Sequence, residues 1–205
     1  IATGARSRAI PGVPFDGEKV ISSKEAMTLP AIPKNLVIIG AGAIGVEFAY
    51  FYNSFGAKVT LIEMLPHVLP IEDAEVSDQL ERSLKKQGIK VMTGTKVQKL
   101  EKSDTGVSLD VETSKGAEKI EAEKALVAIG VQANSEGLGL EELGINLNRG
   151  FIVVDKNYKT NIDNIFAIGD VVGPPLLAHK ASAEAINCVE KITSHTNKDV
   201  DYTSI

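Results

Sequence analysis

The 205-residue sequence has no tryptophan, a single cysteine and no apolar run near the roughly 20 residues that a membrane-spanning helix needs. The lone Cys188 cannot form an internal disulfide, which is typical of proteins from reducing compartments. Basic residues are fewer than acidic ones: the sequence has 22 Lys and Arg and 27 Asp and Glu, which gives a formal charge of −5. We therefore expect a soluble protein of the cytoplasm or an organelle matrix that binds neither nucleic acid nor membrane.

What the chain does contain suits one large or two small globular domains, with 43% hydrophobic and 24% charged residues. It opens with Ile1-Ala-Thr-Gly-Ala5, which is typical of the end of a strand entering a turn. A strand of this kind usually has its partners earlier in the sequence. We expect the chain to be a piece of a longer protein.

The middle of the chain alternates between strand and helix patterns. Strands are predicted at 36–39, 59–62 and 89–92, and helices at 43–55 and 74–87. The apolar helical stripes consist of Ile44, Phe48, Phe51 and Phe55 in the first helix and of Val76, Leu80 and Leu84 in the second. This β-α-β-α-β order predicts an α/β fold, a Rossmann-like doubly wound parallel sheet.

Beyond residue 92 the apolar period becomes two. Strands at 97–102, 107–113 and 118–121 are predicted to form a three-stranded antiparallel β-meander, and 125–129 to return to the parallel sheet. Further strands are expected at 151–154 and 165–168, and a last helix at 178–193. Residues 6–33 are expected to connect elements, with one helical turn capped by Ser22 and Glu25. A composition shift near Asn148 predicts a domain boundary within residues 132–150.

The first predicted helix follows the string Gly40-Ala-Gly-Ala-Ile-Gly45, which fits G-x-G-x-x-G. The string alone is weak evidence, but here it leaves an apolar strand and enters a helix, which is the context of a dinucleotide site. Gly40 permits the tight turn, Gly42 lets the backbone approach a pyrophosphate and Gly45 lets the helix sit against the strand. The free N–H groups of the helix start then face the phosphates. The competing interpretation is a tight turn without a ligand.

An acid follows the second strand at the position where dinucleotide sites bind the ribose. Glu63 lies 18 residues beyond Gly45, and its carboxylate can accept both ribose hydroxyls of NAD while repelling the 2′-phosphate of NADP. Residues 64–70 contain no arginine that would bind such a phosphate. The sequence therefore favours NAD over NADP, although Glu63 could also be an ordinary solvated acid.

Taken together, these motifs resemble the pyridine-nucleotide disulfide oxidoreductase family. The resemblance covers the whole chain and is carried by the Gly-rich loop, by Val59-Thr-Leu-Ile-Glu63 and by Ile165-Phe-Ala-Ile-Gly-Asp170. Within the family, Leu69-Pro-Ile-Glu-Asp-Ala-Glu-Val76 and Gly173-Pro-Pro-Leu-Leu-Ala-His-Lys-Ala181 look most like the dihydrolipoyl dehydrogenase branch. The resemblance implies three segments: the end of a first FAD-domain segment with a linker (1–30), an NAD-binding domain (31–148) and an incomplete second FAD-domain segment (149–205).

The resemblance also implies roles for individual residues. Contacts to NAD are expected from Gly40, Gly42, Ala43, Ile44, Gly45, Glu47, Glu63, Val97 and Gly130. Contacts to FAD are expected from Gly4, Gly169, Asp170, Ala178 and His179, with Asp170 on the ribityl chain. Glu47 would lie by the nicotinamide and pair with a lysine of the redox-active segment, or it is simply an acid favoured by a helix start. Asp170 could instead be an acid that begins a turn, and His179 a surface histidine.

The chain departs from the family in two ways. Val131, Gln132 and Ala133 occupy a stretch where the family commonly has an arginine and a proline. The chain also lacks the Gly-rich FAD fingerprint, the redox-active cysteine pair and the C-terminal dimerisation domain with its histidine–glutamate pair. Cys188 is most simply a small core residue. We therefore expect no catalytic residue in this chain and an exposed apolar face on its incomplete FAD lobe.

The family implies a parent enzyme that oxidises dihydrolipoamide with NAD⁺ through FAD, with lipoyl domains of 2-oxo acid dehydrogenase complexes as partners. This chain would supply the NAD(H) side and would not turn over alone. Mercuric reductase, soluble transhydrogenase, NADH oxidase and glutathione reductase are alternatives within the family. From another class, a stand-alone NAD-binding module is the alternative, and the Gly169-Asp170 motif counts against it.

Overall fold

The computed structural model describes residues 1–193 and 199–204. The chain forms two compact units: a central unit, Ser7–Gly130, and a terminal unit, Ile1–Arg6 with Val131–Ile205. The sequence patterns put the divisions at 30/31 and 148/149, whereas these units divide after Arg6 and after Gly130. Residues 7–30 fall in the central unit because they carry a strand of its sheet, β2.

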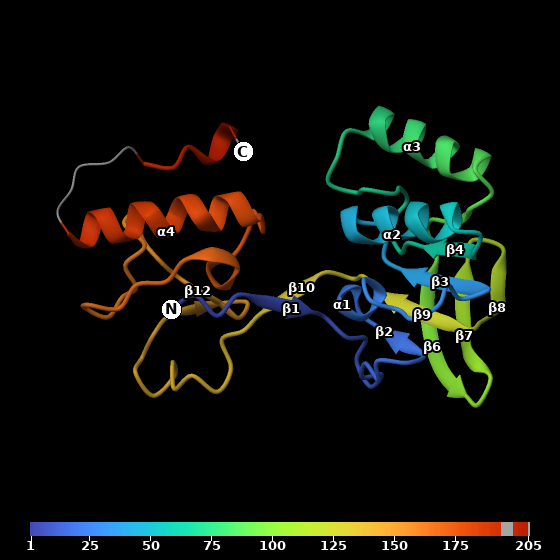
Figure 1. Ribbon diagram of the computed structural model, residues 1–205, viewed down its shortest axis with the longest axis horizontal. Helices are drawn as coiled ribbons and strands as arrows, with labels where there is room; N and C mark the ends of the chain where they lie inside the picture. Colours follow the sequence, from blue (N-terminus) through green and yellow to red (C-terminus); the bar gives the residue numbers. More distant parts are fainter. Residues whose placement is uncertain (194–198, 205) are drawn as a thin grey trace. The chain divides into compact units, whose positions relative to one another are not determined.

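The centre of the central unit is a five-stranded sheet in which every neighbouring pair is parallel (Figure 1). Its strands, in spatial order, are β2 (Val20–Ile21), β9 (Lys124–Val127), β3 (Asn35–Ile39), β4 (Lys58–Ile62) and β5 (Lys90–Met92). The predicted doubly wound sheet is confirmed, including the return of β9. The sequence missed β2, since two apolar residues among prolines and glycines give no periodic signal.

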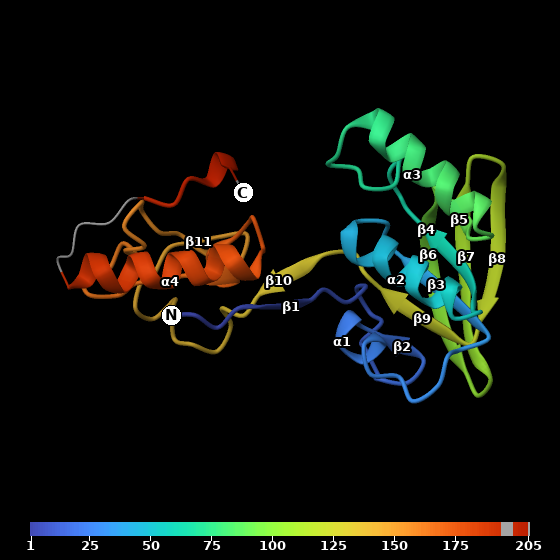
Figure 2. The ribbon, with the colours of Figure 1, turned by 45° about the horizontal axis from the view of Figure 1, so that its top comes forward.

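An antiparallel meander covers one face of this sheet. It consists of β6 (Lys96–Ser103), β7 (Gly106–Thr113) and β8 (Gly116–Ala122), in that spatial order. Leu109 and Val111 of β7 are buried in one cluster with Val37 and Ile39 of β3. A second cluster on the other face joins Ile38 and Leu61 to the helices. The parallel sheet therefore lies between the meander and the helices, as Figure 2 shows.

The helices of this unit are α1 (Ser23–Ala26), α2 (Ala43–Ser54) and α3 (Ala74–Lys86). The capping box of Ser22 and Glu25 is present at α1, as predicted. The predicted stripe of α2 is partly wrong, because Phe48 packs against the core but Phe51 and Phe55 are 43% and 63% exposed. The buried face consists instead of Gly45, Val46, Ala49 and Tyr52. Gly45 and Ala49 allow this face to lie close to the sheet, and the ring of Tyr52 is buried with it, while Phe51 and Phe55 stay largely outside.

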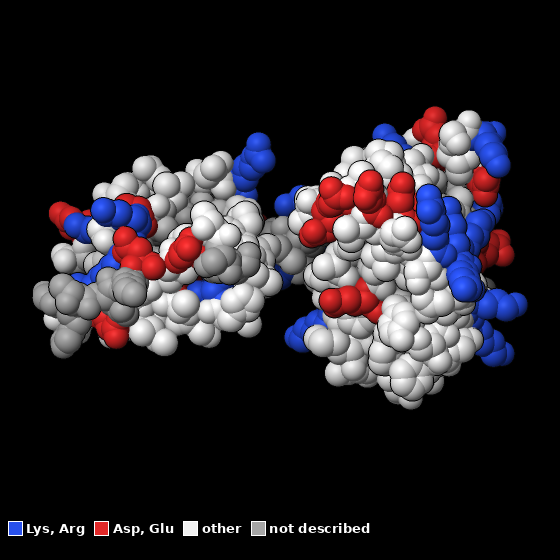
Figure 3. Space-filling model, turned by 90° about the horizontal axis from the view of Figure 1, so that it is seen from above, with Lys and Arg blue, Asp and Glu red and all other residues white. Residues whose placement is uncertain are grey.

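Helix α3 begins at Asp73, whose carboxylate accepts the N–H of Glu75. Its predicted stripe is partly wrong, since Leu84 is buried but Val76 is 54% exposed. Ser77 takes the inner position because its hydroxyl donates to the carbonyl of Leu69. Charges suit the helix dipole, with acid in the first turn and lysines in the last. Figure 3 shows acidic and basic side chains gathered in separate groups over this unit.

The terminal unit contains short elements around a small core. Its elements are β1 (Ala5–Ser7) paired with β10 (Val131–Ala133), β11 (Leu147–Asn148) paired with β12 (Phe151–Ile152), the 3-10 helix η1 (Gly169–Val172), α4 (Ala178–Ile192) and η2 (Tyr202–Ser204). The core consists of Ala133, Leu140, Ile145, Ile152, Ala167 and Val171. Among the described residues no helix is long and apolar enough to cross a membrane.

Two expectations for the terminal unit meet different outcomes. The predicted strand at 165–168 is wrong, because the segment makes a single bridge, between Phe166 and Lys159. Its backbone makes separate hydrogen bonds, to Ile1 on one side and to Tyr158 and Thr160 on the other, and Ala167 is fully enclosed. An exposed apolar face was expected, and Ile186, Val189 and Ile192 of α4 are each more than half exposed.

Candidate functional site

The Gly-rich loop leaves β3 at the carboxyl edge of the sheet and is confined on two sides. Gly40 has φ +101°, and a Cβ there would lie 2.4 Å from the carbonyl oxygen of Ala128. A Cβ on Gly45 would lie 1.9 Å from the carbonyl oxygen of Gly40. Backbone therefore packs on backbone at both positions, and only glycine fits.

Gly42 differs from Gly40 and Gly45 because the space that a Cβ would occupy is open. A Cβ at this position would meet no atom within 4 Å, and its φ of −72° is open to any residue. It is the N-cap of α2, and no side chain caps the helix. The first N–H groups of a helix have no partner within it and carry the positive end of the dipole. Ala43, the first residue of α2, is exposed and Ile44 is half-buried. The loop thus forms an open cradle for an anionic group.

Glu63 follows β4 and lies beside this cradle. Because Ile39 and Ile62 are paired, their strands end together, and Gly40 donates its N–H to the carbonyl of Ile62. One carboxylate oxygen of Glu63 accepts the N–H of Ala41 at 2.7 Å, and the other accepts the N–H of Leu65 at 2.9 Å. The residue is 9% exposed, so it is not an ordinary solvated acid. Each oxygen keeps a further lone pair for a ligand hydroxyl.

Two other predicted nucleotide contacts lie apart from the loop in sequence. Gly130 follows β9, whose Val127 is paired with Ile39, so it lies at the same edge of the sheet as the Gly-rich loop. It is exposed and has φ +106°. Val97 is half-buried on β6 and packs in the core between the meander and the sheet. The structure thus brings Gly40, Glu63 and Gly130 to one edge, with Val97 in the adjoining layer.

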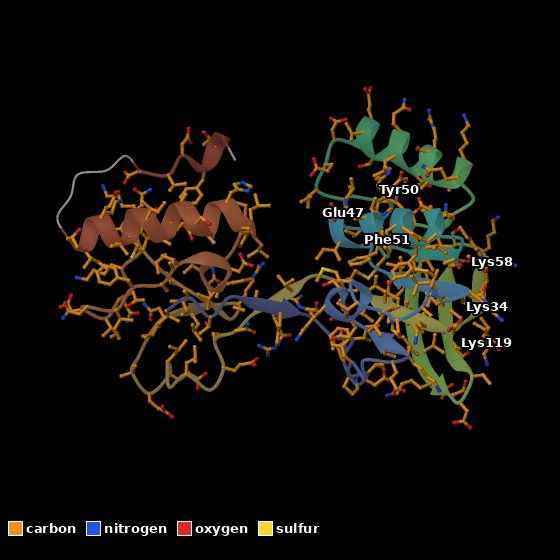
Figure 4. All side chains as sticks on the ribbon, viewed as in Figure 1. Lys34, Glu47, Tyr50, Phe51, Lys58 and Lys119 are labelled. Carbon is orange, nitrogen blue, oxygen red and sulfur yellow. The ribbon has the colours of Figure 1, made fainter. Side chains whose placement is uncertain are left out.

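Glu47 lies on the exposed side of α2, in a groove of about 420 Å³. The groove is lined by Ala26, Met27, Glu47, Phe48, Tyr50 and Phe51. Figure 4 shows Glu47, Tyr50 and Phe51 on α2, and Lys34 and Lys58 at the amino ends of β3 and β4, on the opposite side of the unit. The sequence missed this groove because its aromatic residues had helical spacing and were assigned to the core.

The five residues expected to contact FAD all belong to the terminal unit. Gly4 has φ +72°, and its carbonyl accepts the N–H of Asn134. Asp170 is half-buried in η1, and its carboxylate has no bonding partner among residues 1–193 and 199–204. Ala178 and His179 begin α4, which no side chain caps, and both are exposed. An unpartnered carboxylate and a free helix start are donors and acceptors that fit a polyhydroxylated, phosphorylated cofactor.

The stretch that departs from the family pattern forms β10. From the neighbouring β1, Arg6 donates to the carbonyl of Ala133 and to the side chain of Asn134, and it pairs with Glu136. An arginine therefore reaches this stretch from another strand, which the sequence reasoning did not foresee. It also missed a buried ion pair in α4, Lys180 with Glu184, whose only sequence signal is the i, i+4 spacing.

A profile of the pyridine nucleotide-disulphide oxidoreductase family matches residues 1–185. The chain belongs to this family. Membership of this family implies use of NAD(H) and FAD. The chain is 48% identical over 198 residues to the dihydrolipoyl dehydrogenase of Rhizobium etli, and 42% identical over 207 residues to that of Bacillus subtilis. These matches cover 96% and 100% of the chain but only 41% and 44% of the relatives. The chain thus spans less than half the length of these relatives of the family.

Solved structures give the same assignment of family and fold. The LpdA protein of Mycobacterium tuberculosis matches with a TM-score of 0.90 and 31% identity, over 100% of this chain and 44% of that one. The HOCl-induced flavoprotein disulfide reductase RclA of Escherichia coli matches with a TM-score of 0.84 and 30% identity, over 97% of this chain and 45% of that one. The family fold is therefore shown along nearly the whole chain.

Proposed function

We propose that the central unit binds NAD(H) at the carboxyl edge of its parallel sheet. The observation that carries this proposal is the cradle at Gly42, open in front and bordered by the buried carboxylate of Glu63. The pyrophosphate would lie against the loop of Gly40, Gly42 and Gly45 and the first N–H groups of α2, at Ala43 and Ile44. The ribose hydroxyls would donate to the free lone pairs of Glu63.

The same carboxylate selects NAD over NADP. A 2′-phosphate would be brought against Glu63, which is held in place by two backbone N–H groups and cannot swing away without leaving both unpaired. Glu47, Val97 and Gly130 complete the proposed site. Glu47, exposed on α2, would lie near the nicotinamide end, and Val97 and Gly130 would line the site by packing and backbone contacts.

For the terminal unit we propose part of an FAD site. The unpartnered carboxylate of Asp170 would accept the ribityl hydroxyls, and the first turn of α4, at Ala178 and His179, would approach the flavin ring with its N–H groups. Gly4 and Gly169 would contribute backbone at tight turns, where both have positive φ. FAD supplies the electron-accepting ring when bound, and the residues of this chain bind and orient it.

We propose that the whole protein oxidises dihydrolipoamide with NAD⁺, giving lipoamide, NADH and a proton. The branch-specific strings near Leu69 and Gly173 and the 48% identity to a dihydrolipoyl dehydrogenase support this choice. Its partners would be lipoyl domains of 2-oxo acid dehydrogenase complexes and a second subunit, in the cytoplasm or an organelle matrix. The thiol chemistry requires a cysteine pair that this sequence does not contain, so the 205 residues alone would bind NADH without turning over.

The experiment compares substrates in a protein of the relatives' length that includes this sequence. NAD⁺ reduction would be measured with dihydrolipoamide, and NADH oxidation with lipoamide, oxidised glutathione, mercuric ion and oxygen. Turnover with the lipoyl substrates at least about a hundredfold above the others supports the proposal. Preference for another acceptor would place the protein in a different branch of the family. Lipoamide turnover by the 205-residue chain alone would refute the proposal that this chain binds NADH without turning over.

A further inference from the structure

Two opposite charges are buried side by side in the terminal unit, on the same helix as the expected FAD contacts Ala178 and His179. Lys180 and Glu184 lie one turn apart on α4 with 1% and 2% of their side chains exposed. The ammonium nitrogen of Lys180 is 3.3 Å from a carboxylate oxygen of Glu184. Such a pair loses hydration on both sides, so its presence needs a reason beyond filling space.

The pair bonds to both ends of η1. Lys180 Nζ donates to the carbonyls of Gly169, at 3.2 Å, and of Gly173, at 2.9 Å. Glu184 Oε2 accepts the N–H of Gly169 at 2.7 Å. Gly169 and Gly173 have φ of +75° and +107°, so the backbone on either side of η1 is in the region that glycine favours. The turn that carries Asp170 is therefore held by one ion pair of α4, the helix that packs against it (Figures 1 and 2).

A third side chain completes the bonding of Glu184. The hydroxyl of Tyr202, from η2, donates to Glu184 Oε1 at 2.8 Å, although its ring is 45% exposed. Burial, with the hydrogen bond to Glu184, raises the pKa of Tyr202 above its ordinary value, which keeps the hydroxyl neutral and donating. Glu184 thus accepts hydrogen bonds from Gly169 and Tyr202 and forms an ion pair with Lys180, so both of its carboxylate oxygens have partners.

Packing alone does not account for this arrangement. Apolar residues of similar volume would fill the same space without losing hydration, and buried pairs replaced in this way are often as stable as before. What apolar residues cannot do is bond the N–H of Gly169 and the carbonyls of Gly169 and Gly173. The pair therefore contributes geometry to the η1 turn more than it contributes stability to the fold.

We propose that Lys180 and Glu184 are positioning residues that hold the η1 turn so that the carboxylate of Asp170 is presented, already oriented, to the ribityl chain of FAD. Neither side chain touches the cofactor; each acts through the backbone of Gly169 or Gly173. Tyr202 fixes Glu184 and extends the network to η2. The inference rests on the proposed FAD contact of Asp170 and adds a cause for its orientation.

The test measures FAD affinity and stability separately, in a protein of the relatives' length. The double variant Lys180→Met/Glu184→Leu removes both charges and leaves neither buried alone, so its Tm should recover relative to either single variant. Its FAD dissociation constant, measured by flavin fluorescence, should still rise at least about tenfold, because the turn loses hydrogen bonds to charged groups. Hydrogen exchange in a peptide covering 165–173 should quicken while exchange in α4 stays slow.

Two control variants separate positioning from general destabilisation. Cys188→Ala creates a small void on the buried face of the same helix, so it should lower Tm and leave FAD affinity unchanged. Glu81→Gln breaks an exposed pair of the same spacing, with Lys85, and should change neither. Tyr202→Phe, at a partly exposed ring, should fold and weaken FAD severalfold.

The possible outcomes distinguish a failure of the proposed function from a failure of the inference about Lys180 and Glu184. A wild-type protein that binds no FAD would overturn the proposed function and this inference with it. A wild-type protein that binds FAD, with unchanged affinity in both the double variant and Tyr202→Phe, would overturn the inference alone. Loss of FAD affinity only in proportion to lost Tm, matched by Cys188→Ala, would reduce the pair to a structural role.

Discussion

Replacing Gly42 with alanine separates nucleotide binding from folding, because the glycines of the loop have different surroundings. A Cβ at Gly42 meets no atom within 4 Å, and the backbone there (φ −72°, ψ −174°) is extended and suits any residue. Alanine is a poorer N-cap than glycine, which costs about 0.5 kcal/mol, while the loss of backbone freedom in the unfolded chain returns about the same. The free energy of unfolding should therefore change by less than about 1 kcal/mol.

Gly45 is the matched comparison within the same loop. An alanine there would place its Cβ 1.9 Å from the carbonyl oxygen of Gly40, which itself lies against Ala128. Neither backbone segment can yield without separating α2 from β3, so Gly45→Ala should lose more than about 3 kcal/mol, the upper range of overpacking. Its neighbour Gly42→Ala should instead put a methyl group where the pyrophosphate approaches.

The assay combines urea unfolding, followed by circular dichroism, with a titration of NADH followed by its own fluorescence. The chain has no tryptophan, so no tryptophan emission complicates the nucleotide signal. We expect Gly42→Ala to unfold like the wild type and to bind NADH at least about tenfold more weakly, which corresponds to 1.4 kcal/mol. Binding by Gly42→Ala equal to the wild type would refute the pyrophosphate assignment. Wild-type stability of Gly45→Ala would refute the packing argument.

Three further predictions concern the stability and reactivity of residues elsewhere in the two units. Burial alone would raise the pKa of Asp16, but hydrogen bonds from the backbone N–H groups of Val20, Glu18 and Lys19 hold it well below its ordinary value. A carboxyl group with a lowered pKa in the folded state stabilises the protein at pH values above its unfolded pKa of about 3.9. The free energy of unfolding should therefore fall as the pH drops below about 4. In Asp16→Asn, urea titrations should show a smaller fall over the same pH range. Tyr52→Phe removes a buried hydroxyl that donates to the carbonyl of Ala26 and should cost about 1 kcal/mol in the same assay, and an unchanged midpoint would contradict this. Burial raises the pKa of the Cys188 thiol, so alkylation at neutral pH should be slow until urea unfolds the terminal unit, and fast labelling of the native chain would contradict its place in the core.

The sequence predicted the elements whose patterns are long and strongly periodic. The alternation from Leu36 to Met92, the meander and the return of β9 are confirmed, because β3, β4 and β9 bury nearly continuous apolar runs and β7 alternates buried with exposed residues. The capping box at Ser22 was predictable for a local reason, since its hydrogen bonds span only three residues.

Other features depend on contacts distant in sequence, which explains why the sequence reasoning failed there. The spacing of Phe51 and Phe55 indicated a core face, yet the face that carries Gly45 and Tyr52 packs inward, because Gly45 must touch Gly40. The segment expected as a strand at 165–168 makes a few backbone hydrogen bonds and one bridge, and an apolar pattern cannot show how far such pairing extends. The backbone contacts of Lys180 and Glu184 are to a turn seven to fifteen residues earlier, which their own spacing cannot reveal.

The central claim is that the central unit holds a nucleotide site that selects NAD(H) through Glu63. The most direct measurement is a fluorescence titration of NADH into the purified 205-residue chain, with NADPH as the matched ligand and Glu63→Gln as the matched variant. We predict saturable binding of NADH at least about tenfold tighter than that of NADPH, and loss of this preference in Glu63→Gln. Equal affinity of the folded wild-type chain for both nucleotides, or no saturable binding of NADH, would contradict the account.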